Sequence, residues 1–156
     1  MEELLKLLDP FLVLENINFE EDRISLYTKS TRTDVVCPYC KTTSNKVHSH
    51  YSRSFQDLPI QGNKVTIVLD NRKMFCQNPN CGHKTFAEKF SFLVHKSKKT
   101  IRLEDEIVRI SQNISSVKAA KLLKKSVAMV GKSTICNILK KRIDYHQERA
   151  SKEGLY

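Results

Sequence analysis

The chain has 156 residues and a formal net charge of +10, with 40% hydrophobic residues, no Trp, four Gly and four Pro. This length holds one ordinary domain or two small ones, and the composition excludes a low-complexity or collagen-like chain. The N-terminus, Met1-Glu-Glu-Leu-Leu-Lys, lacks the apolar segment of a secretory signal, and no apolar run approaches the roughly 20 residues that span a bilayer. We therefore expect a cytoplasmic protein without a membrane partner.

The charge is distributed unevenly along the chain. Residues 1–36 have 4 basic and 8 acidic side chains, a net charge of −4. Residues 37–90 have 8 and 3, net +5, and residues 91–156 have 15 and 6, net +9. A basic C-terminal half is suited to neutralising phosphates, which favours a nucleic-acid partner. The alternative is that these lysines serve only solubility.

The apolar patterns of the first half predict one short helix and several strands. Residues 2–8 form an amphipathic helical pattern that Pro10 ends. Residues 12–19 and 23–29 predict a β-hairpin. Residues 47–55 and 64–69 predict two further strands, with Pro59 and Gly62 in the link between them.

From about residue 101 the hydrophobic period becomes helical and predicts three short helices. Their apolar positions are Leu103, Ile107, Ile110 and Ile114 in the first, Val117, Ala120 and Leu123 in the second, and Ile135, Ile138, Leu139 and Ile143 in the third. Ser115 or Ser116 is the expected N-cap of the second helix, and Gly131 precedes the third. Three short helices in this arrangement are typical of a helix-turn-helix unit.

Four of the five cysteines form two close pairs, Cys37-Pro-Tyr-Cys40 and Cys76-Gln-Asn-Pro-Asn-Cys81. In a reducing compartment such pairs bind a metal more often than they form disulfides. Each loop can bring two thiolates to one ion at about 2.3 Å, and two loops complete a tetrahedral site. We predict one structural Zn²⁺, held by Cys37, Cys40, Cys76 and Cys81, and no zinc catalysis, because four protein ligands leave no position for water.

Three histidines lie close to these pairs in the sequence. His48, His50 and His83 are alternative ligands, but one zinc ion needs only four ligands and the cysteines provide them. Cys136 occupies an apolar position of the third predicted helix, where we expect a core residue.

We therefore predict an α+β chain in which a small β-rich zinc ribbon precedes a helix-turn-helix module. The expected divisions are an N-terminal helix and hairpin over residues 1–36, a four-cysteine zinc-ribbon domain over residues 37–95, a helix-turn-helix domain over residues 96–145 and a tail over residues 146–156.

The helix-turn-helix prediction supplies candidate DNA-binding residues. The later helix of such a unit lies in the major groove with its N-terminal residues at the base edges. The candidates are Lys132, Ser133, Asn137, Lys140 and Lys141 on the third helix, and Lys118, Lys121, Lys124 and Lys125 on the second. We expect Lys132, Ser133 and Asn137 to reach bases and the other lysines to contact phosphates. The alternative is a solvated helix face without a partner.

The sequence gives little support for catalysis. Glu104, Asp105 and Glu106 are consecutive at the start of a predicted helix, so they point in different directions and cannot converge on one metal. Gly131-Lys-Ser-Thr134 resembles the end of a phosphate-binding loop, but Ser126 stands where that motif requires its first Gly. We expect no enzymatic activity and no small-molecule substrate.

Several motifs recur in the order known for one protein family, over roughly residues 10–143. They are Cys37-Pro-Tyr-Cys40, His48-Ser-His-Tyr51-Ser-Arg53, Asp57-Leu58-Pro59-Ile-Gln-Gly62, Arg72-Lys-Met-Phe75-Cys76-Gln-Asn-Pro-Asn-Cys81, Lys84-Thr85-Phe86-Ala-Glu88, Ala119-Ala120-Lys-Leu122-Leu123 and Thr134-Ile135. The chain resembles the N-terminal region of bacterial insertion-sequence transposases of the ISL-three type. Members of that family carry a zinc-binding region, a helix-turn-helix and then a DDE catalytic domain with an RNase H-like fold.

The resemblance implies sequence-specific binding of double-stranded DNA at transposon terminal inverted repeats. The chain ends at Tyr156, about where the catalytic domain would begin, so we expect a truncated or free-standing DNA-binding region without transposase activity. A zinc-ribbon adaptor that docks a protein, a transcriptional regulator, and the non-catalytic half of a split transposase remain alternatives. Besides double-stranded DNA, the partners considered are a second copy of the chain and a separately encoded transposase catalytic chain.

Overall fold

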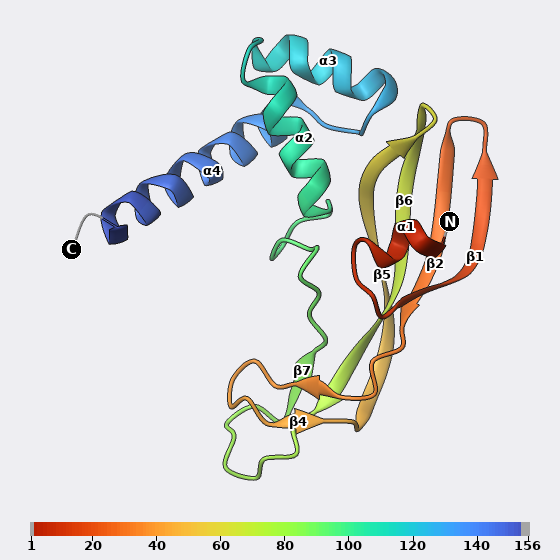
Figure 1. Cartoon of the computed structure of the whole chain (residues 1–156), viewed down its shortest axis with the longest axis vertical. Helices are drawn as coiled ribbons and strands as arrows, with labels where there is room; N and C mark the ends of the chain where they lie inside the picture. The colour runs from red at the N-terminus through yellow and green to blue at the C-terminus, as the bar shows by residue number, and fades with distance from the viewer. Residues whose placement is uncertain (1, 154–156) are drawn as a thin grey trace.

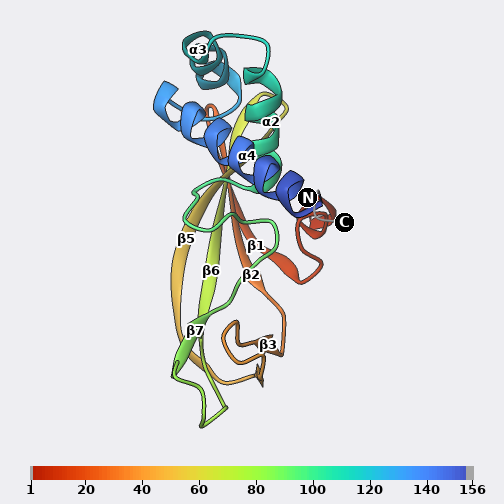
Figure 2. The same ribbon diagram turned by 90° about the vertical axis from the view of Figure 1, so that its left-hand side faces the viewer.

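The computed structural model describes residues 2–153, with side chains for residues 2–125 and 127–144. A long sheet occupies the middle of the molecule, the loops that carry the paired cysteines lie at one end, and α2, α3 and α4 lie at the other (Figures 1 and 2). The elements in chain order are α1 (Glu2–Lys6), β1 (Leu12–Glu20), β2 (Arg23–Ser30), β3 (Val35–Val36), β4 (Thr43–Ser44), β5 (Val47–Ile60), β6 (Asn63–Phe75), β7 (Thr85–Ala87), α2 (Ile101–Ser111), α3 (Ser116–Ser126) and α4 (Lys132–Glu153). The α+β prediction is confirmed.

The main sheet is built around β6. Its strand order is β1-β2-β6-β5, with β7 also paired to β6. The β2–β6 pair is parallel, whereas β1–β2, β5–β6 and β6–β7 are antiparallel. Val65, Ile67 and Leu69 of β6 are all buried. Main-chain pairing along almost all of β5 and β6 holds them together even where their side chains are polar, so both strands are longer than the hydrophobic pattern predicts.

The turn between β5 and β6 is set by two residues with positive φ. Gln61 has a φ of 49° and Gly62 a φ of 81°. Positive φ at both central residues is the requirement of a type I′ hairpin turn, and glycine meets it without a steric penalty. Pro59 lies inside β5, next to the irregularity in register between Asp57 and Ile60, and not in the turn where the sequence suggested it. A proline there is tolerated because the pairing is already interrupted.

One hydrophobic core joins the N-terminal segment to the sheet. Its buried members are Leu5, Leu12, Ile24, Leu26, Phe55, Val65, Leu69, Phe90 and Phe92. These residues come from both sides of residue 36, where the sequence suggested a domain boundary. The predicted hairpin is present, but β2 pairs directly with β6 and so belongs to the same sheet.

A buried polar cluster fixes the segment that leaves β7. The Glu88 carboxylate accepts hydrogen bonds from Ser30 Oγ at 2.7 Å and from Arg72 Nε at 2.8 Å. Arg32 lies 3.4 Å from the same carboxylate and also pairs with the buried Asp9. A buried carboxylate requires such partners, and their arrangement ties β6 and the segment after β7 to the N-terminal segment.

The helices α2, α3 and α4 enclose a separate core. Its buried residues are Leu103, Ile107, Ala119, Leu123, Ala128, Val130, Ile135 and Ile138. Ser115 caps α3, as predicted, by accepting the backbone N–H of Lys118. The stripe predicted for the first of these helices does not extend to Ile114, because α2 ends at Ser111 and Ile114 is exposed in the link to α3. Ile143 is exposed, and α4 continues to Glu153, through much of the predicted tail.

Asp57 anchors the start of α2 to the sheet. Its buried carboxylate accepts hydrogen bonds from Thr100 Oγ1 at 2.7 Å and from Arg102 Nε at 2.8 Å, and it pairs with a second guanidinium nitrogen of Arg102. Thr100 is the N-cap of α2. The next residue, Leu58, packs against the helical core. The Asp57-Leu58-Pro59 motif therefore positions the helices on the end of the sheet.

Within residues 2–153, none of the helices is sufficiently long and apolar to cross a membrane.

Candidate metal centre and nucleic-acid interface

The first cysteine loop closes a small hairpin. Val35 and Val36 pair with Ser44 and Thr43, and the chain between them turns back through Cys37-Pro-Tyr-Cys40. The backbone N–H of Cys37 donates to the Thr42 carbonyl at 2.9 Å, and the N–H of Lys41 donates to the Cys37 carbonyl at 3.0 Å. Lys41 has a φ of 63°, which reverses the chain immediately after Cys40.

The second cysteine loop connects β6 to β7. Phe75 pairs with Thr85, and the Cys76 N–H donates to the Lys84 carbonyl at 2.8 Å. Within the loop, the Cys81 N–H donates to the Asn78 carbonyl at 3.1 Å. The Asn78 side chain accepts the N–H of Asn80, so this residue makes the tight turn that brings Cys81 back toward Cys76.

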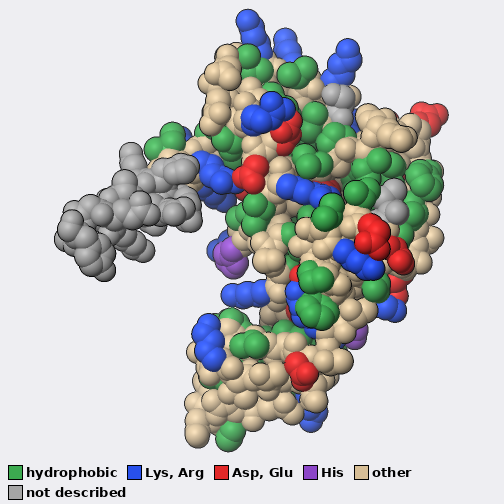
Figure 3. All heavy atoms as spheres, viewed as in Figure 1, with side chains coloured by type: hydrophobic (Ala, Val, Ile, Leu, Met, Phe, Trp, Pro, Cys, Tyr) green, Lys and Arg blue, Asp and Glu red, His purple; other side chains and the backbone are tan. Residues whose placement is uncertain are grey.

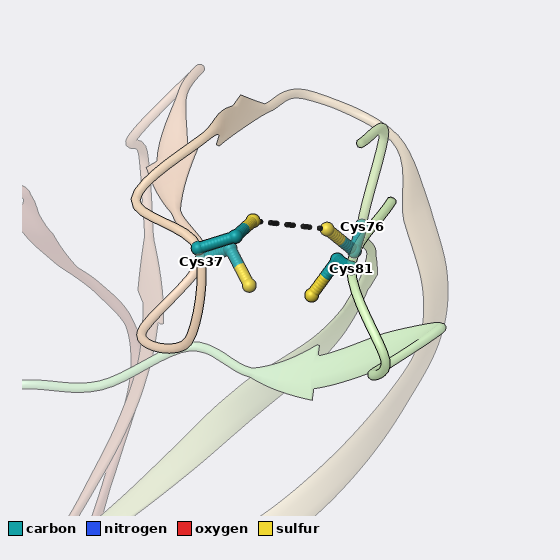
Figure 4. A group of neighbouring side chains, drawn as sticks. Cys37, Cys76 and Cys81 are labelled. Carbon is teal, nitrogen blue, oxygen red and sulfur yellow. Dashed lines mark hydrogen bonds between the residues drawn. The ribbon is translucent and has the colours of Figure 1, made fainter. Parts of the chain in front are cut away.

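The two loops face each other, and their four sulfurs converge. Figure 4 shows the thiols of Cys37, Cys76 and Cys81 directed into the space between the loops. All four sulfurs lie within 4.8 Å of one another, and Cys40 Sγ is 3.5 Å from Cys76 Sγ. Four thiolates at about 2.3 Å from one tetrahedral zinc ion would be about 3.8 Å apart, so these positions fit the ion. All five cysteines belong to the described part of the chain and none forms a disulfide.

Further contacts hold the loops together outside the cysteine cluster. Ser44 Oγ donates to the Phe75 carbonyl at 2.6 Å. Tyr39 of the first loop stacks on His83 of the second, with ring centroids 3.5 Å apart. The hydrophobic core at this end of the molecule consists of Val35, Cys37, Met74 and Phe86. So small a core gives little stabilisation by itself, and a metal ion is the usual supplement in such modules.

The electrostatics of the cluster also favour a cation. Hydrogen bonds from the Thr42 hydroxyl and backbone N–H lower the pKa of Cys40 to about 6. The Asn78 N–H acts to lower the pKa of Cys76, but burial and the neighbouring thiols outweigh it and raise that pKa to about 12. The Cys76 thiol therefore resists ionisation beside Cys40 without a compensating charge, and a divalent ion provides that charge.

The three histidines considered as alternative ligands are engaged elsewhere. His50 Nδ1 is 2.9 Å from Asp70 Oδ2, His48 Nδ1 is 2.8 Å from Ser49 Oγ, and His83 stacks on Tyr39. Within the described residues, the group that could hold a metal consists of the four cysteines alone. The donor set and its proximity support one structural Zn²⁺, as the sequence predicted.

Two cysteine-bearing loops held by short strands around one ion form a zinc ribbon. Residues 33–81, which include all four cysteines, match the family model described as the zinc-finger of transposase IS204/IS1001/IS1096/IS1165. No curated protein and no solved structure matches the chain.

The candidate DNA-binding residues lie on the surface of α3 and α4. Lys118, Lys121, Lys124 and Lys125 of α3 and Lys132, Ser133, Asn137, Lys140 and Lys141 of α4 are all exposed. Basic side chains project from the end of the molecule that α3 forms (Figure 3). On α4, Ser133, Asn137, Lys140 and Lys141 share one face, because their spacing is i, i+4, i+7 and i+8. Ile135 and Ile138 are buried on the opposite side of the helix, so this face points away from the core.

The structure adds a second group of basic residues that we did not single out from the sequence. Lys96 and Lys98 belong to the segment between β7 and α2 and are exposed beside Asn137 and Lys141 of α4. Arg53 of β5 lies on the other side of the same segment. The run Lys96-Ser-Lys98-Lys99 is visible in the sequence, but the residues of β5 and α4 that lie beside it in the fold are distant along the chain.

Proposed function

We propose that this protein binds double-stranded DNA through α3 and α4, with the zinc ribbon as a structural support. The observation that carries the proposal is the exposed face of α4, where Ser133, Asn137, Lys140 and Lys141 lie together, with further exposed lysines on α3. Asparagine and serine can read base edges, and lysines can neutralise phosphates. The match of residues 33–81 to a transposase zinc finger supports the same partner.

The arrangement of the helices agrees with a helix-turn-helix. In such a unit one helix positions the next, whose N-terminal half enters the major groove. Here α3 and α4 pack on a common core through Ala119, Leu123 and Ile135, and the small Ala119 allows close approach. The link between them, residues 127–131, is longer than the usual turn, but Ala128 and Val130 are buried in that core and hold it in place.

The proposed target is the terminal inverted repeat of a transposon, because the family that residues 33–81 match consists of transposases. The chain would then act as a DNA-recognition region, alone or with a separate catalytic chain. Selection of bound sequences from random duplex DNA tests this target. The expected result is enrichment of one motif that occurs as inverted repeats at the ends of a mobile element. Recovery of bound duplexes that share no enriched motif would refute the proposed target.

Charge reversal on α4 tests the role of this helix. The triple variant Lys132→Glu, Lys140→Glu and Lys141→Glu is expected to lose duplex DNA binding by at least about a hundredfold at low salt, because three attractive charges become repulsive. Fluorescence anisotropy with a labelled duplex measures the affinity. Circular dichroism and zinc content should be unchanged, since all three side chains are exposed.

A matched control reverses three basic side chains away from α3 and α4. Lys6→Glu, Lys29→Glu and Lys84→Glu change the net charge equally, and these side chains are also exposed. The control should retain most of the affinity. Equal affinity of the α4 variant and wild type would favour the protein-docking adaptor instead.

A further inference from the structure

We infer that the DNA-binding surface continues from α4 across residues 96–98 onto β5, so that Arg53, Lys96 and Lys98 contact the phosphate backbone. This inference rests on the proposed DNA-binding function and extends it to a different part of the fold. None of Arg53, Lys96 and Lys98 is among the DNA-binding residues that the sequence predicted.

Residues 96–98 lie between two hollows in the surface. One hollow is lined by this segment together with Thr134, Asn137, Ile138 and Lys141 of α4. The other is lined by the same segment together with Ser52, Arg53, Ser54 and Phe55 of β5. The two hollows share Lys96, Ser97 and Lys98, so the surface runs without a break from the helix to the sheet. Figure 3 shows basic side chains along the side of the molecule between the helices and the zinc ribbon.

This surface carries positive charges that are accessible to a partner. Lys96, Lys98 and Lys141 are exposed, and Arg53 is half-buried with its guanidinium over the Phe55 ring. Among the described residues, none of these four cations forms an ion pair. Cations that are not neutralised by the protein itself are suited to displacing counterions from DNA.

The nearby charges do not cancel this surface. Glu104 lines the first hollow, but it is buried and accepts a hydrogen bond from Ser97 Oγ at 2.7 Å. Lys99 lies close enough to Glu104 for their charges to interact: burial lowers the pKa of Lys99, and the Glu104 charge acts in the opposite direction. The charge of Lys99 therefore offsets that of Glu104. The contact surface therefore consists of the exposed Lys96 and Lys98, with Arg53 and Lys141 on either side.

The segment is held in a fixed position against β5. Gln56 of β5 donates its N–H to the Lys98 carbonyl at 2.8 Å and accepts the Thr100 N–H at 3.0 Å. Lys96 has a φ of 60°, in the left-handed region that a lysine seldom adopts. Such a conformation persists only where surrounding contacts impose it. A surface of fixed shape that joins a helix to a sheet can follow the backbone of a duplex beyond the groove that α4 would occupy.

The double variant Lys96→Gln and Lys98→Gln tests the inference. Its affinity for a labelled duplex of mixed sequence is measured between about 50 and 200 mM salt, the range over which phosphate contacts have a large effect. Each contact contributes roughly 0.9 to the slope of log affinity against log salt. The slope should therefore become shallower by about 2 in this variant. Arg53→Gln, made separately, should make it shallower by about 1.

The control variant Lys6→Gln and Lys29→Gln removes the same charge from side chains that line neither hollow. Its slope should equal that of wild type. A steep wild-type slope that neither Lys96→Gln/Lys98→Gln nor Arg53→Gln changes would overturn this inference and leave binding by α4 intact. A flat wild-type slope would overturn the proposed function itself.

Discussion

Replacing Cys76 by serine is expected to release about one zinc ion per chain and to unfold the end of the molecule that holds the cysteine loops, residues 35–44 and 74–87, while the sheet around Phe55, Val65 and Leu69 stays folded. The hydroxyl of serine is a poor zinc ligand, and three remaining thiolates leave the site open. Structural zinc sites contribute on the order of 10 kcal/mol of apparent binding free energy to folding. The core formed by Val35, Cys37, Met74 and Phe86 is too small to replace that contribution.

The measurement is the zinc content of the purified protein, together with its circular dichroism and thermal unfolding. Cys136→Ser is the matched control, because Cys136 lies on α4 and outside the four-cysteine cluster. The control should keep its zinc. Treatment of the wild-type protein with a strong chelator should reproduce the Cys76→Ser spectrum. Stoichiometric zinc in Cys76→Ser would contradict the four-cysteine site.

Replacing Asp57 by alanine is expected to destabilise the protein by roughly 2–3 kcal/mol. The carboxylate is 2% exposed and is the shared acceptor for Thr100 and Arg102. Its removal leaves a buried hydroxyl and a guanidinium without their partner. The Arg102 side chain is 34% exposed, so water can replace part of the lost contact, and we place the effect below that of a fully buried ion pair. The helices should then separate more readily from the sheet.

Urea unfolding measures the free energy, and limited proteolysis of residues 88–100 measures the opening of the junction. Asp70→Ala is the control. Asp70 also pairs with a basic side chain, His50, but both are well exposed, so the expected cost is under about 1 kcal/mol. If the two variants lost equal stability and were cleaved equally, Asp57 would not anchor the helices.

The parts of the structure that the sequence predicted are those set by short-range patterns. The spacing of the cysteines is local, and in a reducing compartment two such pairs favour a metal over disulfides, so the zinc site was predictable. Ser115 at the start of α3 is another local signal, since a side chain that caps a helix contacts a residue only three positions away.

The remaining features depend on segments that are distant in the sequence. Nothing in residues 23–30 specifies that β2 pairs in parallel with β6, because its partner residues, 64–70, are distant in the sequence. The role of Asp57 was also hidden, because its partners Thr100 and Arg102 lie 43 and 45 residues further along the chain. Lys96 and Lys98 gain significance only when β5 and α4 lie on either side of them.

The salt dependence of duplex binding by the zinc-loaded wild-type protein tests the proposed DNA-binding function most directly. If about six phosphates are contacted, log affinity should fall with a slope of roughly −5 against log salt. Such a slope would be expected if exposed basic side chains of the protein displace counterions from DNA. A slope near zero, in protein that retains its zinc and its fold, would contradict DNA binding by this surface.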